Sequence, residues 1–126
     1  MGQKSHADTS WVIALLNPDD AHHKESLRQL EELNSAPSLS AFALAELLVD
    51  FEKSDIARPE NTLEELLNSF SHVIALSTEI VIRAAQIRSN HKITLGDAII
   101  IASALHENSE LLTFDRSMRA IYERVK

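Results

Sequence analysis

The fold is decided by the stretch TLGDAIIIASALHENSELLTFDR, residues 94–116 of the 126-residue chain. Thr94 is a typical helix N-cap residue, and the apolar run that follows predicts a helix over 94–107. A polar turn and a short apolar strand over 110–113 come next. Asp97 lies at the start of the helix, and Asp115 lies just beyond the strand. In a parallel α/β domain both positions are at the carboxyl-end edge of the sheet, where ligand sites form. The two acids are therefore half of a candidate metal site.

Short strands and helices alternate along the rest of the chain. Strands are predicted to end near residue 8 and to cover 37–39, 72–76 and 110–113. Helices are predicted over 11–16, 22–33, 41–51, 61–70, 79–90, 94–107 and 117–124. No repeat or linker interrupts this pattern, which predicts one α/β domain, 1–126, with a parallel sheet covered on both faces. Residues 1–6 are neither apolar nor helical, so we expect them to be disordered or an expression remnant.

The composition predicts a cytoplasmic protein with no membrane attachment. No apolar run reaches the length of a membrane span, and no secretory signal peptide is visible. Because the chain has no cysteine, it has neither disulfides nor thiolate metal ligands, as is usual in a reducing compartment.

The net charge of −7 disfavours loose, charge-driven binding of nucleic acid. The acidic residues are concentrated in the first part of the chain, since residues 1–79 sum to −9 and residues 80–126 sum to +2. A nucleic-acid surface would therefore draw on the bases of the second part. These are Arg83, Arg88, Lys92, Arg116 and Arg119.

Two acids upstream extend the candidate site. Asp8 lies where the first predicted strand meets a helix, and Glu46 lies inside a mostly apolar helix. Mg²⁺ and Mn²⁺ take hard oxygen ligands, usually a few carboxylates together with waters. Since converging carboxylates repel one another unless a cation neutralises them, Asp8, Glu46, Asp97 and Asp115 predict a site for one or two such ions.

The chemistry that such a cluster serves is phosphodiester cleavage. A divalent metal orients a water and stabilises the charge that develops on the phosphate. A carboxylate that is not a ligand can accept the proton of this water. Thr9, Ser10 and Thr113 are placed to hydrogen-bond the ligands or a bound water.

Each acid also has a simpler explanation. Asp8, Asp97 and Asp115 could be helix-capping residues, and Glu46 could belong to a solvated helix face. The residues alone therefore leave two other functions open: a catalytically weak binding module, or a metal-dependent phosphatase or nuclease with another substrate. The segment Asp8-Thr9-Ser10 lacks a second acid two residues after the first, which counts against a phosphatase.

Four segments together resemble PIN-domain ribonucleases, in particular the VapC-like toxins of bacterial type II toxin–antitoxin pairs. Asp8-Thr9-Ser10 is similar to the opening motif of the family, and residues 42–48 (FALAELL) resemble its helical glutamate segment. Residues 95–102 (LGDAIIIA) and 111–115 (LLTFD) resemble its two later motifs. The order and approximate spacing are those of the family over nearly the whole chain.

The resemblance implies a three-layer α/β/α fold around a parallel sheet of four or five short strands. It implies an endoribonuclease dependent on Mg²⁺ or Mn²⁺, with Asp8, Glu46, Asp97 and Asp115 as the catalytic and metal-binding pocket and Thr113 as its support. It also implies an RNA substrate, a homodimer, and a cognate antitoxin that occupies the groove near the acids. Only eleven residues follow Asp115, which leaves little room for the customary last strand.

Overall fold

The computed structural model describes residues 3–53 and 59–126. Its centre is a parallel sheet of four short strands in the order β3-β2-β1-β4. His6 is paired with Ser38 of β2 on one side and with Leu111 of β4 on the other. The predicted α/β fold is confirmed, in its four-stranded form. The strands are β1 (Ser5–Ala7), β2 (Ser38–Ser40), β3 (Val73–Ile74) and β4 (Glu110–Leu112).

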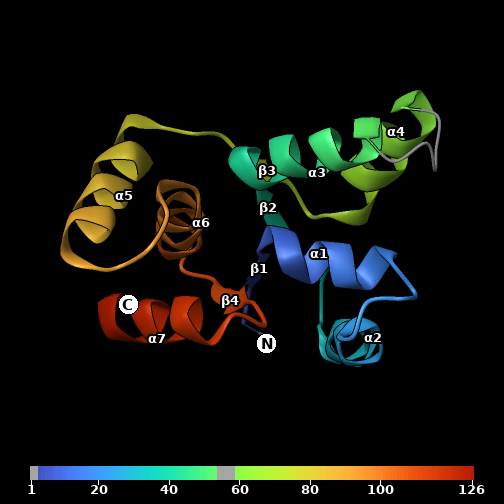
Figure 1. The fold of residues 1–126 in the computed structure, drawn as a ribbon, viewed down its shortest axis with the longest axis horizontal. Coiled ribbons are helices and arrows are strands. Elements are labelled where there is room, and N and C mark those ends of the chain that lie inside the picture. Colours follow the sequence, from blue (N-terminus) through green and yellow to red (C-terminus); the bar gives the residue numbers. More distant parts are fainter. Residues whose placement is uncertain (1–2, 54–58) are drawn as a thin grey trace.

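Helices cover both faces of this sheet, which gives the predicted three-layer arrangement. Figure 1 shows α5, α6 and α7 on one side of the strands and α1 to α4 on the other. The helices are α1 (Thr9–Leu16), α2 (His23–Glu32), α3 (Ala41–Lys53), α4 (Pro59–Ser69), α5 (Thr78–Asn90), α6 (Leu95–His106) and α7 (Arg116–Val125).

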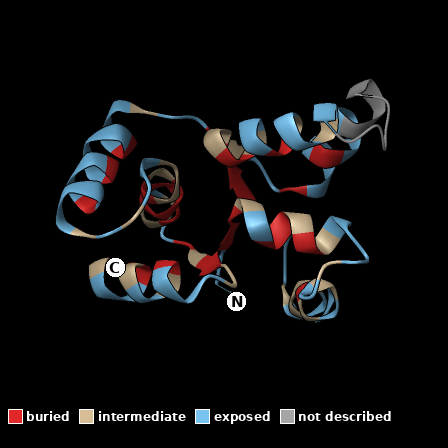
Figure 2. Cartoon of the chain, viewed as in Figure 1, coloured by how far each residue is buried: buried red, intermediate tan, exposed pale blue. Residues whose placement is uncertain are grey.

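The core lies between the helices and the sheet, and α6 is its most deeply buried helix. Ile100 and Ile101 are buried on α6 together with its small residues Ala98, Ala102 and Ala104. Figure 2 shows α6 coloured largely as buried, whereas α5 is buried on its inner side only. A helix that is apolar around most of its circumference is expected to have protein on several sides. This placement fixes the first turn of α6, which carries Asp97, relative to the rest of the fold.

The first strand corrects the expectation for Ser5 and His6, whereas residues 1–2 lie outside the described part of the chain. Ser5 and His6 are buried in β1, although their side chains are poor strand formers. Since β1 is paired on both edges, tertiary context outweighs intrinsic propensity. His6 Nδ1 is 2.7 Å from Ser38 Oγ, and burial lowers its pKa to about 4, so the ring is neutral at neutral pH.

The last segment of the chain forms α7 and no strand. The hydroxyl of Tyr122 donates to the carbonyl of Ser109 at 2.7 Å and ties α7 to the start of β4. No fifth strand is present in the part of the chain that the structure describes. Among the described residues, no helix is long and apolar enough to cross a membrane.

Candidate active site

The candidate site lies at the carboxyl ends of β1 and β4. The chain passes from β1 to β2 on one side and later returns to β4 on the other, so β1 and β4 flank a topological switch point. Ligands bind outside the carboxyl ends of the strands at such points. Asp8 follows β1, and its N–H donates to the carbonyl of Leu112 at 3.1 Å. Thr113 follows β4, and its hydroxyl donates to Asp8 Oδ2 at 2.5 Å.

Asp8 is a buried carboxylate held by several donors. Its Oδ1 accepts the N–H of Trp11 at 2.7 Å, which caps α1, and Ser10 Oγ is 3.1 Å from both of its oxygens. Only 3% of Asp8 is exposed. Burial raises its pKa and the repulsion of Asp97 adds to this, although the bonds from Thr113, Trp11 and Ser10 act in the opposite direction. Asp8 therefore caps α1, and its burial makes the ionised carboxylate less favourable than it would be in water.

Asp97 and Asp115 extend this negative charge toward solvent. Thr94 caps α6 by accepting the N–H of Asp97 at 3.1 Å, which leaves the Asp97 carboxylate half-buried in the first turn. Asp115 is exposed and caps α7, because its Oδ1 accepts the N–H of Met118 at 3.0 Å. Burial raises the pKa of Asp97, and the charge of Asp115 raises it further. Asp97 thus interacts with an acid on either side, Asp8 and Asp115.

Glu46 joins the site through a hydroxyl. It is exposed on α3, and its Oε1 accepts the hydroxyl of Thr9 at 2.5 Å. Thr9 is the residue after Asp8, so this bond ties α3 to the start of α1 beside the acids. Hydrogen bonds and charge repulsion link five of the seven residues predicted from sequence into one network, namely Asp8, Ser10, Asp97, Thr113 and Asp115. The other two, Thr9 and Glu46, adjoin this network because Thr9 follows Asp8 in the chain.

A close contact between α3 and α6 positions Asp97, and it was not predicted from sequence. A methyl group added to Gly96 would stand 2.5 Å from Cε2 and from Cζ of the Phe42 ring. With the ring in this position, a side chain at residue 96 fits only if the ring or the first turn of α6 shifts. The available signal was a glycine inside a predicted helix, which costs up to about 1 kcal/mol and often marks close packing.

The chemistry of these side chains fits a hard divalent cation. Asp97 repels both Asp8 and Asp115, these carboxylates offer oxygen ligands, and a bound cation would relieve the repulsion. Across residues 3–53 and 59–126, no three His, Cys, Asp or Glu side chains already converge as a complete set of metal ligands. Mg²⁺ commonly takes one or two carboxylates and keeps several waters, so it does not need such a set.

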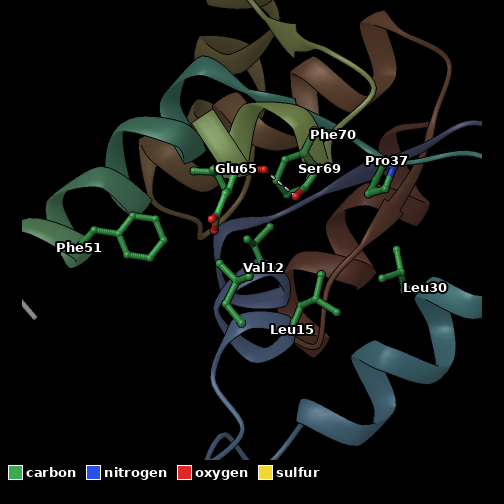
Figure 3. A pocket seen from close by; sticks show the side chains of 10 residues that line it. Val12, Leu15, Leu30, Pro37, Phe51, Glu65, Ser69 and Phe70 are labelled. Atoms are coloured by element: carbon green, nitrogen blue, oxygen red, sulfur yellow. Dashed lines mark hydrogen bonds between the residues drawn. The ribbon is translucent and has the colours of Figure 1, made fainter. Parts of the chain in front are cut away.

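An apolar hollow lies elsewhere on the surface. It has a volume of about 210 Å³ and lies between α1, α2, α3 and α4, where Val12, Leu15 and Phe51 contribute to its wall (Figure 3). None of the seven residues predicted from sequence lines it. Carboxylate chemistry requires the polar network, so the hollow is not the candidate active site.

Thr113→Val is expected to lower the free energy of unfolding by about 1–3 kcal/mol, because it removes the hydroxyl that satisfies buried Asp8. The loss of this donor should also raise the pKa of Asp8 further, since the bond now lowers it. Urea unfolding would measure the change in stability. Thr78→Val is the matched control, because Thr78 is an exposed threonine at the start of α5. Equal effects of the two substitutions would show that the Thr113 bond contributes nothing.

Comparison with known proteins gives a family match and a set of similar folds. The family model described as PIN domain matches residues 7–124. No curated protein sequence matches the chain. A toxin–antitoxin complex from Klebsiella pneumoniae contains a similar chain, with 26% identity, a TM-score of 0.76, and coverage of 90% of this chain and 89% of that one.

Two further solved structures share the fold at lower identity. FitAcB from Neisseria gonorrhoeae is 22% identical with a TM-score of 0.78, and the match covers 94% of this chain and 93% of that chain. VapC20 from Mycobacterium tuberculosis, described as a toxin that cleaves the sarcin–ricin loop, is 20% identical with a TM-score of 0.78. This match covers 93% of this chain and 94% of that chain.

Proposed function

The chain belongs to the PIN-domain family, and we propose that it is a divalent-metal-dependent endoribonuclease and the toxin of a toxin–antitoxin pair. The observation that carries the proposal is the repulsion of Asp97 with both Asp8 and Asp115, where Asp8 follows β1 at the switch point of the sheet. The toxin–antitoxin complex from Klebsiella pneumoniae and the RNA-loop-cleaving toxin VapC20 support the choice of substrate and partner.

Each acid has a distinct part in this proposal. Asp8, Asp97 and Asp115 would hold Mg²⁺ or Mn²⁺, as one ion or two. The metal, when bound, supplies a Lewis acid that activates water and neutralises charge on the phosphate. Glu46 is exposed and accepts the hydroxyl of Thr9, and it would take the proton of the attacking water. Thr113 and Ser10 keep Asp8 in place through their bonds to its carboxylate.

The alternative from another class is a binding module in which the acids serve only as caps. This alternative has support in the structure, because Asp8 caps α1 and Asp115 caps α7. A carboxylate oxygen has two lone pairs, however, and a capping bond leaves room for a metal. The two functions differ in whether a divalent cation stabilises the fold.

We expect millimolar Mn²⁺ or Mg²⁺ to raise the thermal midpoint by roughly 3–10 °C at about ten times the Kd of the metal. The reason is that a cation bound by the folded state relieves the repulsion around Asp97. Differential scanning fluorimetry would measure the midpoint, with KCl of equal ionic strength as the control for screening. Asp97→Asn should abolish most of the rise. A rise that survives in this variant would place the metal elsewhere, and the absence of any rise in the parent would favour the capping alternative.

We also propose that the protein forms a homodimer and is inhibited by a cognate antitoxin. Val81 and Ile82 lie together on α5 and are 47% and 54% exposed, and such apolar side chains are suited to a subunit contact. Light scattering of the purified chain tests the dimer. Co-expression with the product of a small adjacent gene tests the antitoxin, since a partner of this kind should co-purify and suppress RNA cleavage.

A further inference from the structure

A stacked pair of rings lies at the edge of the acidic network. The imidazole of His22 and the phenyl ring of Phe114 have centroids 4.4 Å apart, and their planes are inclined by only 9°. Phe114 is half-buried and His22 is exposed, so one face of the imidazole is covered by Phe114 while the residue itself remains open to solvent. The pair joins the segment before α2 to the segment between β4 and α7.

Phe114 belongs to the same short segment as the site residues. It lies between Thr113, which donates to Asp8, and Asp115, whose N–H donates to Thr113 Oγ1 at 3.0 Å. Consecutive Cα atoms are 3.8 Å apart, so the backbone of Phe114 is one residue away from each of these groups. The stacked pair is therefore anchored in the same turn after β4 that carries Thr113 and Asp115.

The segment that carries His22 is held in place by its own hydrogen bonds. The N–H of His22 donates to Asp20 Oδ1 at 2.8 Å, and the N–H of His23 donates to the carbonyl of Asp20 at 3.0 Å. The ring of His23 is fastened to α1, with its Nδ1 2.8 Å from the carbonyl of Ala14. The imidazole of His22 is thus presented from a fixed backbone, as a binding surface requires.

We propose that His22, backed by Phe114, is a stacking platform for one nucleobase of a single-stranded RNA substrate. This inference rests on the proposed ribonuclease function. Unpaired bases stack on flat aromatic and histidine side chains in RNA-binding proteins, and the contact tolerates any base. Stacking also needs no positive charge, which suits a chain whose net charge of −7 attracts phosphate poorly. The platform would fix a nucleotide next to the phosphodiester bond at the acids.

The test uses a single-stranded RNA nonamer with 2-aminopurine at its centre, whose fluorescence is quenched on stacking. Binding is titrated in EDTA to prevent turnover, and KM and kcat are measured separately with Mg²⁺. We expect His22→Ala to raise Kd and KM about tenfold, which corresponds to about 1.4 kcal/mol, while kcat changes less than twofold. His22→Phe should keep the parent affinity and quenching. His22→Leu should lose both the affinity and the quenching, because leucine covers Phe114 but has no flat aromatic face on which a base could stack.

Three controls separate stacking from other effects. His106→Ala removes an exposed histidine at the far end of α6 and should leave Kd unchanged. The ratio of Kd between His22→Ala and the parent should be the same at 50 and 200 mM salt, because a stacking contact displaces no counterions. Thermal midpoints of all variants show whether a change in affinity follows a loss of folding.

The outcomes distinguish this inference from the proposed function. If the parent cleaves the RNA and His22→Ala and His22→Leu retain its KM and Kd, the platform is wrong and the pair only fastens two segments together. If His22→Phe loses affinity as strongly as His22→Leu, the imidazole acts by charge or hydrogen bonding rather than by stacking, which also overturns the inference. If the parent neither binds nor cleaves RNA, the proposed function fails with it.

Discussion

Asp97→Asn is expected to lower kcat/KM for RNA cleavage by roughly 10³-fold and to leave the fold intact. The substitution keeps the size of the side chain and removes the charge that repels both Asp8 and Asp115. The cap of α6 is preserved, because its acceptor is the hydroxyl of Thr94 and its donor is the backbone N–H of residue 97. The measurement is single-turnover cleavage of a labelled RNA in Mg²⁺, with circular dichroism as the check on folding.

The stability of this variant is a second, independent readout. In the absence of metal the pKa of Asp97 is raised by burial and by Asp115, so its ionised form opposes folding. A carboxyl with a raised pKa contributes stability at low pH that is lost as the pH rises through that pKa. Asp97→Asn should therefore be as stable as the parent at neutral pH without metal, or slightly more stable.

Glu79→Gln is the matched control for this experiment. Glu79 is an exposed acid in the first turn of α5, as Asp97 is an acid in the first turn of α6, so both favour their helix through its dipole. If the acids acted only at helix ends, the two substitutions would change stability by similar small amounts and leave cleavage alone. Parent-like cleavage by Asp97→Asn would refute the assignment of the metal pocket.

The sequence predicted the second half of the fold better than the first. Residues 94–113 carry a strong cap, a long apolar helix and an apolar strand, and all three signals agree with the tertiary structure. Ser5 and His6 carry no such signal. They form a central strand because β2 and β4 flank them, and this pairing depends on residues more than 30 and 100 positions away. Local propensity contains no information of that kind.

The candidate site likewise contains features that could be predicted from sequence and features that could not. The positions of Asp8 and Asp115 were predictable because each stands between a strand and a helix, and that of Asp97 because it lies in the first turn of a capped helix. The bond from Thr9 to Glu46 joins residues 37 positions apart, and the stacked rings of His22 and Phe114 join two segments 92 positions apart. Periodicity describes the faces of single helices and strands, so it reveals neither contact. His22 in particular stands out in the structure alone.

Gly96→Ala is expected to impair cleavage more than stability, because it acts on the position of Asp97. The added methyl would meet the Phe42 ring at 2.5 Å, so either the ring turns aside or the first turn of α6 moves away from α3. Alanine is usually the better helix residue by up to about 1 kcal/mol, yet overpacking typically costs about 1–3 kcal/mol. We expect a net loss of stability of about 1 kcal/mol. A displacement of the reacting groups by about 1 Å can reduce the rate about 10²-fold.

A double-mutant cycle with Phe42→Ala shows whether the contact itself is responsible. Phe42→Ala alone leaves a space against α6, and the methyl of Gly96→Ala partly fills that space in the double variant. The two substitutions should therefore be markedly non-additive, with the double variant recovering both stability in urea and kcat/KM relative to Gly96→Ala. Additive effects would mean that the two residues are independent. In that case the close approach of α3 and α6 would not position Asp97. The bond from the Asp97 N–H to Thr94 and the bond from Thr113 to Asp8 would then position these two acids.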